Sequence, residues 1–222
     1  MLFGLEIEEV IRAVGVLGIA AIVFAESGLL IGFFLPGDTL LFTAGFLAHT
    51  GALGANVHVM VGILFVAAVL GDNVGYWFGN KMGPRLFKKP DSILFHQDNL
   101  QRAEKFYEKY GPITLVLARF TPVVRTFAPI VAGIGKMQYR RFMLYNLLGG
   151  LLWTAGVTYL GYFGGAFLEA HGINVEALVI PVVAFAVLVS IASPLIHILR
   201  DPKSRRMVLR RLGVKKPDSK VD

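Results

Sequence analysis

Four charged side chains of this sequence lie inside otherwise apolar segments. They are Glu26, Asp38, Arg119 and Arg125. An arginine presents a planar fork of N–H donors that binds a phosphate or a carboxylate through two hydrogen bonds, and it stays charged when water is removed. A buried carboxylic acid favours its neutral form, so it can take up and release a proton. These four residues therefore form the candidate site.

Two acids and two arginines sum to zero charge, which is the cheapest way to keep ionised groups in an apolar interior. Arg119 and Arg125 would diverge on a straight helix, but Pro122 lies between them and breaks that helix. We therefore expect the arginines to converge from two arms of one broken segment and to meet the acids in a polar cavity. The alternative is structural: the ion pairs only hold the broken segments together.

The composition indicates an integral membrane protein. Of 222 residues, 55% are hydrophobic and 17% are charged, whereas soluble domains have about 25% charged residues. The chain has no cysteine, which excludes disulfides, thiolate zinc sites, iron–sulfur clusters and cysteine nucleophiles. Its net charge of +7 comes from basic residues beside apolar segments. This placement favours contact with anionic lipid headgroups and argues against nucleic-acid binding.

Glu26 lies in an apolar run, 13–35, that is long enough to span a bilayer. Pro36-Gly37-Asp38 is then a turn signal, and the apolar run after it is too short to cross as a helix. We predict a re-entrant hairpin over 13–48, with Pro36 and Gly37 at its tip. The alternative is an ordinary spanning helix followed by a surface loop.

The segment 112–135 is also apolar but contains three prolines and both arginines, which makes a poor lipid-facing span. Basic residues flank it on both sides, and the positive-inside rule places both flanks in the cytoplasm. We therefore predict a second re-entrant hairpin over 112–135, entered from the opposite face. A broken hairpin followed by a spanning helix then occurs twice, which is the organisation of an inverted repeat.

The fold class predicted is an all-α integral membrane protein, with a single transmembrane domain over 1–199 and a basic cytoplasmic tail over 200–222. Three long apolar runs predict spanning helices. These runs are 57–79, 142–168 and 177–199. An amphipathic pattern over 96–110 predicts a helix on the membrane surface. Two loops without lysine or arginine, 49–56 and 167–176, are expected outside, and the side of the N-terminus is left open.

The predicted span 57–79 carries two polar residues, Asp72 and Asn73, which we place close to its cytoplasmic end as supporting residues of the site. Capping or loop hydrogen bonds are an equally good explanation of this pair. Glycines at 71, 75 and 79 share one helix face and predict close packing against a neighbouring helix. Trp153 and Tyr159 are interpreted as packing or interface residues.

Three segments, in this order, resemble the signatures of the DedA membrane proteins of the VTT (SNARE-associated) superfamily. The segments are Glu26 followed by Pro36-Gly37-Asp38; Gly71-Asp72-Asn73-Val74-Gly75-Tyr76 with Gly79; and Arg119-Phe120-Thr121-Pro122-Val123-Val124-Arg125 continuing to Ala132-Gly133. The resemblance covers about residues 10–199. Each motif alone has low specificity, whereas all three in order in a membrane protein of this length are fairly specific.

The resemblance implies a lipid transporter that moves a phosphate-bearing lipid between leaflets, with undecaprenyl phosphate recycling as the first candidate and dependence on the proton-motive force. It implies Arg119 and Arg125 as the lipid-phosphate site and Glu26 and Asp38 as the proton-coupling pair. The supporting residues are Asp72, Asn73, Pro36, Gly37 and Pro122. It also implies a multi-pass protein of the bacterial cytoplasmic membrane with a cytoplasmic C-terminus.

Two other functions remain open at this stage. A phospholipid flippase or scramblase, for example for phosphatidylethanolamine, would use the same arginines, and a proton-coupled ion exchanger would use the acids, although paired arginines oppose cation binding. We expect no enzymatic activity, because no nucleophile–base order or phosphatase motif is present. We expect no metal or other cofactor, since the five histidines lie near segment ends without metal-ligand spacing. The expected partners are the lipid substrate and anionic headgroups, and a homo-oligomer is left open.

Overall fold

The computed structural model describes residues 7–29, 37–86, 110–185 and 188, and within these ranges it is helical, without strands. The helices are α1 Ile7–Gly28, α2 Gly37–His49, α3 Val57–Leu86, α5 Thr114–Ala118, α6 Pro122–Ile134 and α7 Tyr139–Ala170, followed by a helix over Val175–Phe185. The predicted all-α fold is therefore correct. The predicted surface helix 96–110 apart from Tyr110, most of the predicted span 177–199, Pro36 and the tail 200–222 lie outside the described residues.

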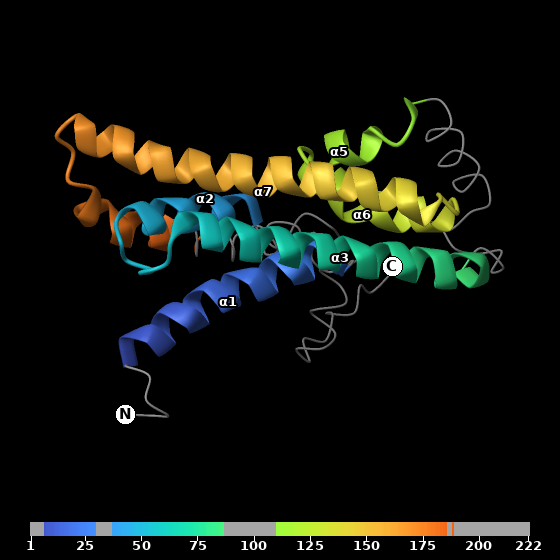
Figure 1. Cartoon of the computed structure of the whole chain (residues 1–222), viewed down its shortest axis with the longest axis horizontal. Coiled ribbons are helices and arrows are strands. Elements are labelled where there is room, and N and C mark those ends of the chain that lie inside the picture. Colours follow the sequence, from blue (N-terminus) through green and yellow to red (C-terminus); the bar gives the residue numbers. More distant parts are fainter. Residues whose placement is uncertain (1–6, 30–36, 87–109, 186–187, 189–222) are drawn as a thin grey trace, which may run out of the picture.

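Two long helices, α3 and α7, form the frame of the molecule. They have 30 and 32 residues, and both are long and apolar enough to cross a membrane. They run side by side along its length (Figure 1) and contact each other. On α7 the side chains of Leu147, Leu151 and Phe163 are exposed, as expected for a helix whose outer face contacts hydrocarbon.

The shorter helices α2 and α6 pack on this frame in different halves of the molecule (Figure 1). α2 lies along α7, and α6 lies along α3. Glycines permit both contacts, because a Cβ at Gly45 would overlap the backbone carbonyl of Thr158 and one at Gly133 would overlap that of Tyr76. Small residues let membrane helices approach this closely.

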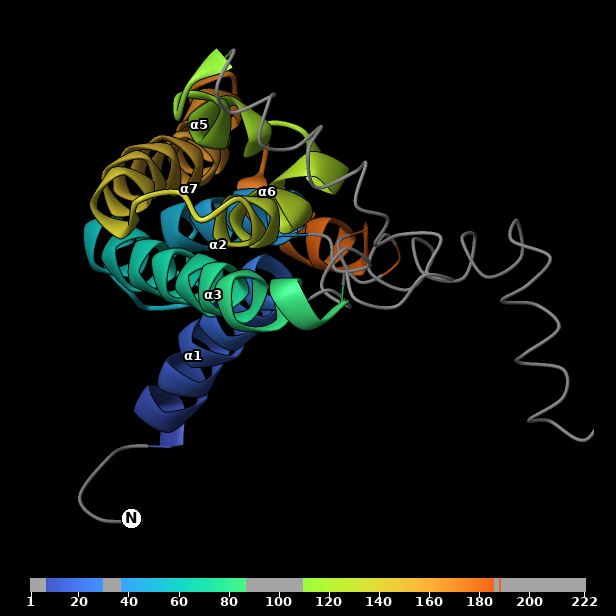
Figure 2. The same cartoon turned by 90° about the vertical axis from the view of Figure 1, so that its right-hand side faces the viewer.

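α1 crosses α3, and its N-terminal end projects away from the other helices (Figure 2). The crossing is close because Gly28 of α1 and Gly71 of α3 face each other, so a Cβ on either residue would press on the backbone of the partner helix. One turn further along α3 from Gly75, Gly79 makes the same kind of contact with Ile130 of α6. The glycine face predicted on this span therefore packs against two neighbouring helices.

Two helix ends position the site, one after α1 and one after α5. α1 ends at Gly28, and α2 begins at Gly37. α5 ends at Ala118, Thr121 is extended with φ −121° and ψ 108°, and α6 begins at Pro122. A proline at the first position of a helix costs no hydrogen bond, which explains why the break predicted between the two arginines falls there.

Candidate functional site

Arg125 joins three helices through two carboxylates. It lies in the first turn of α6, and its Nη1 donates to Asp38 Oδ1 at 2.6 Å while its Nη2 donates to Glu26 Oε1. Glu26 is 2% exposed and Arg125 is 8% exposed, whereas the side chain of Asp38 remains 46% exposed. The structure therefore brings together three of the four residues singled out in the sequence, and Asp38 is the acid of this group that is open to its surroundings.

Glu26 and Asp38 meet at the start of α2. Gly37 is the first residue of that helix, and a side chain there would overlap the Glu26 carboxylate. Absence of a Cβ lets the carboxylate reach the N-terminus of α2, where the backbone N–H groups favour a negative charge. Gly37 thus has a direct role in forming the acidic pair.

Arg119 belongs to a second group, which is built around Asp72 and not around the acidic pair. It lies in the break after α5, and its Nη2 donates to Asp72 Oδ2 of α3 and to Asn146 Oδ1 of α7, the latter at 2.5 Å. Arg119 and Asp72 are each 5% exposed. The expectation of a neutral group of two acids and two arginines needs correction, because Asp72 adds a third carboxylate and the ionised set carries a formal charge of −1.

The helix that carries Asp72 is longer than the predicted span 57–79, because α3 continues to Leu86. Asp72 therefore lies near the middle of α3, where backbone groups are engaged in the helix and only a side-chain partner can satisfy its charge. Arg119 is that partner.

Trp153 of α7 lies between the two groups. Its Nε1 donates to Asp38 Oδ1 at 2.7 Å, and Cζ of Arg125 lies 4.7 Å from the centre of its ring. Cζ of Arg119 is 6.0 Å from the same ring. The side chain is 1% exposed and also packs in the apolar core. The sequence-based interpretation of Trp153 as a packing residue is thus incomplete, while Tyr159 contacts Nδ1 of His58 at 2.5 Å, away from these charges.

Two further residues of α7 contact the site and were missed in the sequence. Asn146 holds Arg119 and donates through Nδ2 to the carbonyl of Val69 at 3.3 Å. Gly149 makes room for the arginine, since a Cβ there would lie 3.0 Å from Cδ of Arg119. A signal was available for Asn146, because a buried amide in the middle of an uncharged span needs a polar partner.

The remaining predicted residues are placed outside the ion pairs. Asn73 donates to the carbonyl of Val69 at 2.7 Å and accepts from the hydroxyl of Tyr139 at 2.9 Å, so it joins α3 to the start of α7. Pro122 begins α6 and acts through the backbone. Pro36 lies outside the described residues.

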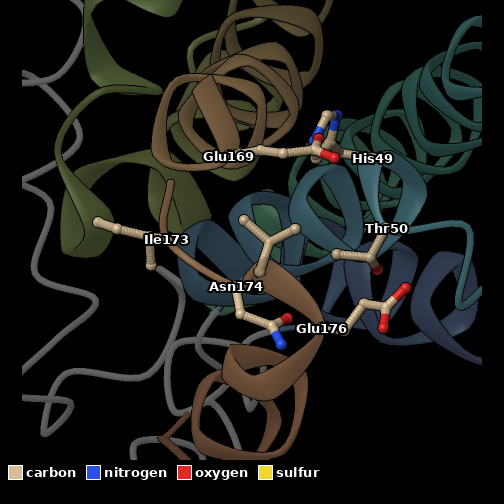
Figure 3. A pocket seen from close by; sticks show the side chains of 7 residues that line it. His49, Thr50, Glu169, Ile173, Asn174 and Glu176 are labelled. Carbon is tan, nitrogen blue, oxygen red and sulfur yellow. The ribbon is translucent and has the colours of Figure 1, made fainter. Parts of the chain in front are cut away.

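A separate polar pocket lies at the end of the molecule where α2 and α7 finish (Figure 3). Its volume is about 200 Å³, and its lining includes Thr50, Asn174 and Glu176. Figure 3 shows His49 and Glu169 pointing toward each other, with Nε2 and Oε2 2.8 Å apart. Within the described ranges no group of three histidine or acidic side chains is arranged to hold a metal ion.

The VTT domain family matches residues 35–163, a range that includes Asp38, Asp72, both arginines and Trp153. The chain is a member of the DedA family of VTT-domain membrane proteins. The family resemblance found in the sequence is therefore confirmed, and Glu26 contacts this domain from the helix that precedes the matched range.

The relatives are bacterial proteins, and two of the three described here are named as membrane proteins. Protein DedA of Escherichia coli K12 is 44% identical over 183 residues, which cover 82% of this chain and 81% of that protein. An uncharacterized membrane protein of Mycobacterium tuberculosis is 41% identical over 176 residues, covering 79% and 77%. The inner membrane protein YqjA of Escherichia coli K12 is 38% identical over 148 residues, covering 65% and 64%. No solved structure shows a significant match to the chain.

Proposed function

We propose that this membrane protein moves a phosphate-bearing lipid between the leaflets of the bacterial cytoplasmic membrane, with undecaprenyl phosphate as the substrate. The observation that carries the proposal is the state of the two arginines. Both are buried near the middle of the frame helices, and each is held by carboxylates. A lipid phosphate offers the same acceptor geometry as a carboxylate, so it can replace an acid on the same N–H donors.

The exposure of the acids suggests the order of exchange. Asp38 has a 46% exposed side chain, whereas Glu26 and Asp72 are 2% and 5% exposed. An arriving phosphate would therefore compete first for the Nη1 of Arg125, where Asp38 is bound. Protonation of the acidic pair on the outer side would weaken its hold on the arginine, and proton release on the inner side would restore the pair and expel the headgroup.

The broken segments fit this role as re-entrant hairpins. In the proposed arrangement 13–48 and 112–135 enter from opposite faces as an inverted repeat, and their breaks meet at mid-depth. The ion pair between Asp38 and Arg125 supports this arrangement, because it joins the first turns of α2 and α6. Irregular backbone at membrane depth is tolerated where protein or a watery cavity surrounds it.

The proposal makes the protein a transporter and not an enzyme, since the lipid crosses chemically unchanged. The proposal also includes the topology predicted from the positive-inside rule, with the basic tail in the cytoplasm. The printed names of two relatives support the location: YqjA is an inner membrane protein, and the mycobacterial relative is a membrane protein.

A reconstitution experiment tests the proposal. The purified protein is placed in liposomes with labelled undecaprenyl phosphate or labelled phosphatidylethanolamine, with and without a pH gradient, beside protein-free liposomes. We expect undecaprenyl phosphate to cross faster than in protein-free liposomes and faster still with the gradient. Faster movement of phosphatidylethanolamine alone would favour the phospholipid alternative. Cation-dependent proton flux without lipid movement would contradict lipid transport.

A further inference from the structure

One carboxylate oxygen of the site is shared by two donors from different helices. Asp38 Oδ1 accepts from Nη1 of Arg125 at 2.6 Å and from Nε1 of Trp153 at 2.7 Å. Trp153 also contacts the arginine itself, with its ring 4.7 Å from the guanidinium carbon. A single indole therefore holds both members of this ion pair, each through a different part of the ring system.

These two contacts do not depend on the ion pair. The indole N–H stabilises the Asp38 carboxylate whether or not Arg125 is bound to it, and the ring face attracts the guanidinium whether or not Asp38 is present. If a phosphate takes the place of Asp38 on Arg125, both ions therefore keep one partner. In the resting pair the indole N–H is a second donor on an oxygen that Arg125 already satisfies, whereas after displacement it is the donor that remains, so this hydrogen bond contributes more to the phosphate-bound state and favours the exchange.

We propose that Trp153 is a positioning residue for phosphate exchange at Arg125. Its ring face keeps the guanidinium in place, and its N–H keeps Asp38 in place while the lipid phosphate binds between them. This inference deepens the proposed lipid transport and rests on it. It assigns to a residue of α7 a role that is distinct from filling the core.

A pair of substitutions separates the two contacts. Trp153→Phe keeps an aromatic face and removes the N–H, whereas Trp153→Leu removes both. We expect Trp153→Phe to raise the half-saturating amount of undecaprenyl phosphate in the liposome assay by about tenfold, because a hydrogen bond to a charged group is worth at least that factor. Its maximal rate should change little. Trp153→Leu should lower the maximal rate as well, because Arg125 is then no longer oriented.

Phe46→Leu is the matched control for lost packing. Phe46 is 2% exposed and lies in the contact between α2 and α7. Its substitution should lower thermal stability about as much as Trp153→Phe does, with the half-saturating amount of lipid unchanged. Equal effects of both substitutions on half-saturation would show that Trp153 only packs, and would overturn the inference.

Fluorescence gives a second test that does not depend on transport rates. The chain has two tryptophans, and Trp77 is 59% exposed, away from the site. In a Trp77→Phe background, Trp153 is the remaining emitter. Addition of undecaprenyl phosphate in detergent should change its emission, and Arg125→Lys in the same background should abolish the change.

The outcomes distinguish the two ideas. If the Trp77→Phe protein transports lipid normally but its fluorescence emission does not change when the lipid is added, the role of Trp153 is overturned. The proposed function would then remain intact. Absence of lipid transport by the unsubstituted protein would remove the proposed function, and the inference with it. Transport together with a lipid-dependent, Arg125-dependent emission change supports both.

Discussion

At the scale of single residues, the two arginines have different environments. Arg125 shares two acids, one deeply buried and one partly exposed, whereas Arg119 is enclosed by Asp72 and Asn146. Removal of one partner of a buried ion pair leaves an uncompensated charge and is strongly destabilising. Substitutions of the individual acids should therefore affect stability and transport to different degrees.

Asp72→Asn should destabilise the protein most clearly. It leaves Arg119, 5% exposed, without its counter-charge, at an expected cost of about 3–5 kcal/mol. The measurement is thermal unfolding in detergent followed by circular dichroism. Asn73→Ala is the neighbouring control, because Asn73 bonds to Val69 and Tyr139 outside the ion pairs and should change stability by only about 1 kcal/mol. Equal losses for the two substitutions would argue against the Asp72–Arg119 pair.

Glu26→Gln and Asp38→Asn should differ from each other. Glu26 is 2% exposed, so its loss should lower the melting temperature markedly. Asp38 has a 46% exposed side chain, and Arg125 keeps Glu26 as its counter-charge when Asp38 is lost, so this substitution should cost less stability. Transport of undecaprenyl phosphate should nevertheless fall in both proteins. If the transport rate fell only in the variant with the lowered melting temperature, a purely structural role for the acids would be favoured instead.

The sequence alone was sufficient to find the buried charges, because an ionised group in an apolar run stands out at any position. It was not sufficient to pair them. The partner of Arg119 depends on how the break after α5 packs against α3 and α7, which the order of the segments in the chain does not show. The contacts of Trp153 depend on the rotation of α7, which packing of the whole molecule determines.

At the scale of helices, glycines decide how closely the site-bearing elements approach. α3 holds α1 through Gly71 and α6 through Gly79, so it sets the distance between Glu26 on one neighbour and Arg125 on the other. The sequence predicted the glycine face from its four-residue spacing. It could not show that this face contacts two helices, because the sequence does not reveal where α1 and α6 cross α3.

Gly79→Ala should therefore disturb the site from a distance. The added methyl group would overlap the backbone of Ile130, which cannot move without shifting α6, at an expected cost of about 1–3 kcal/mol. Gly62→Ala is the matched control on the same helix, because a Cβ there meets nothing within 4 Å. We expect lower melting temperature and slower transport for the first and neither for the second. Identical behaviour of both would contradict the packing of α3 on α6.

At the scale of the whole molecule, the arrangement across the membrane remains a prediction. The positive-inside rule places the loop 49–56 outside and the tail 200–222 inside. Composition could predict the membrane class and the frame helices. It could not establish whether the two broken segments turn back, because apolar residues look the same in a hairpin and in a full crossing.

Absence of native cysteine makes the topology easy to test. Ala52→Cys and Ser219→Cys introduce one thiol each, in the outer loop and in the tail. In intact cells a membrane-impermeant maleimide should label the first and not the second, and permeabilised cells should give labelling of both. Labelling of Ser219→Cys in intact cells would reverse the predicted orientation.

The central claim is that Arg119 and Arg125 bind the phosphate of a lipid in transit. The most direct measurement is the rate of undecaprenyl phosphate movement in liposomes containing Arg119→Lys or Arg125→Lys, at matched protein content and folding, with Gly62→Ala as control. Lysine keeps the charge but lacks the planar fork, so we predict a loss of about tenfold or more in each lysine variant and a normal rate in the control. Near-normal transport in both lysine variants would contradict the account.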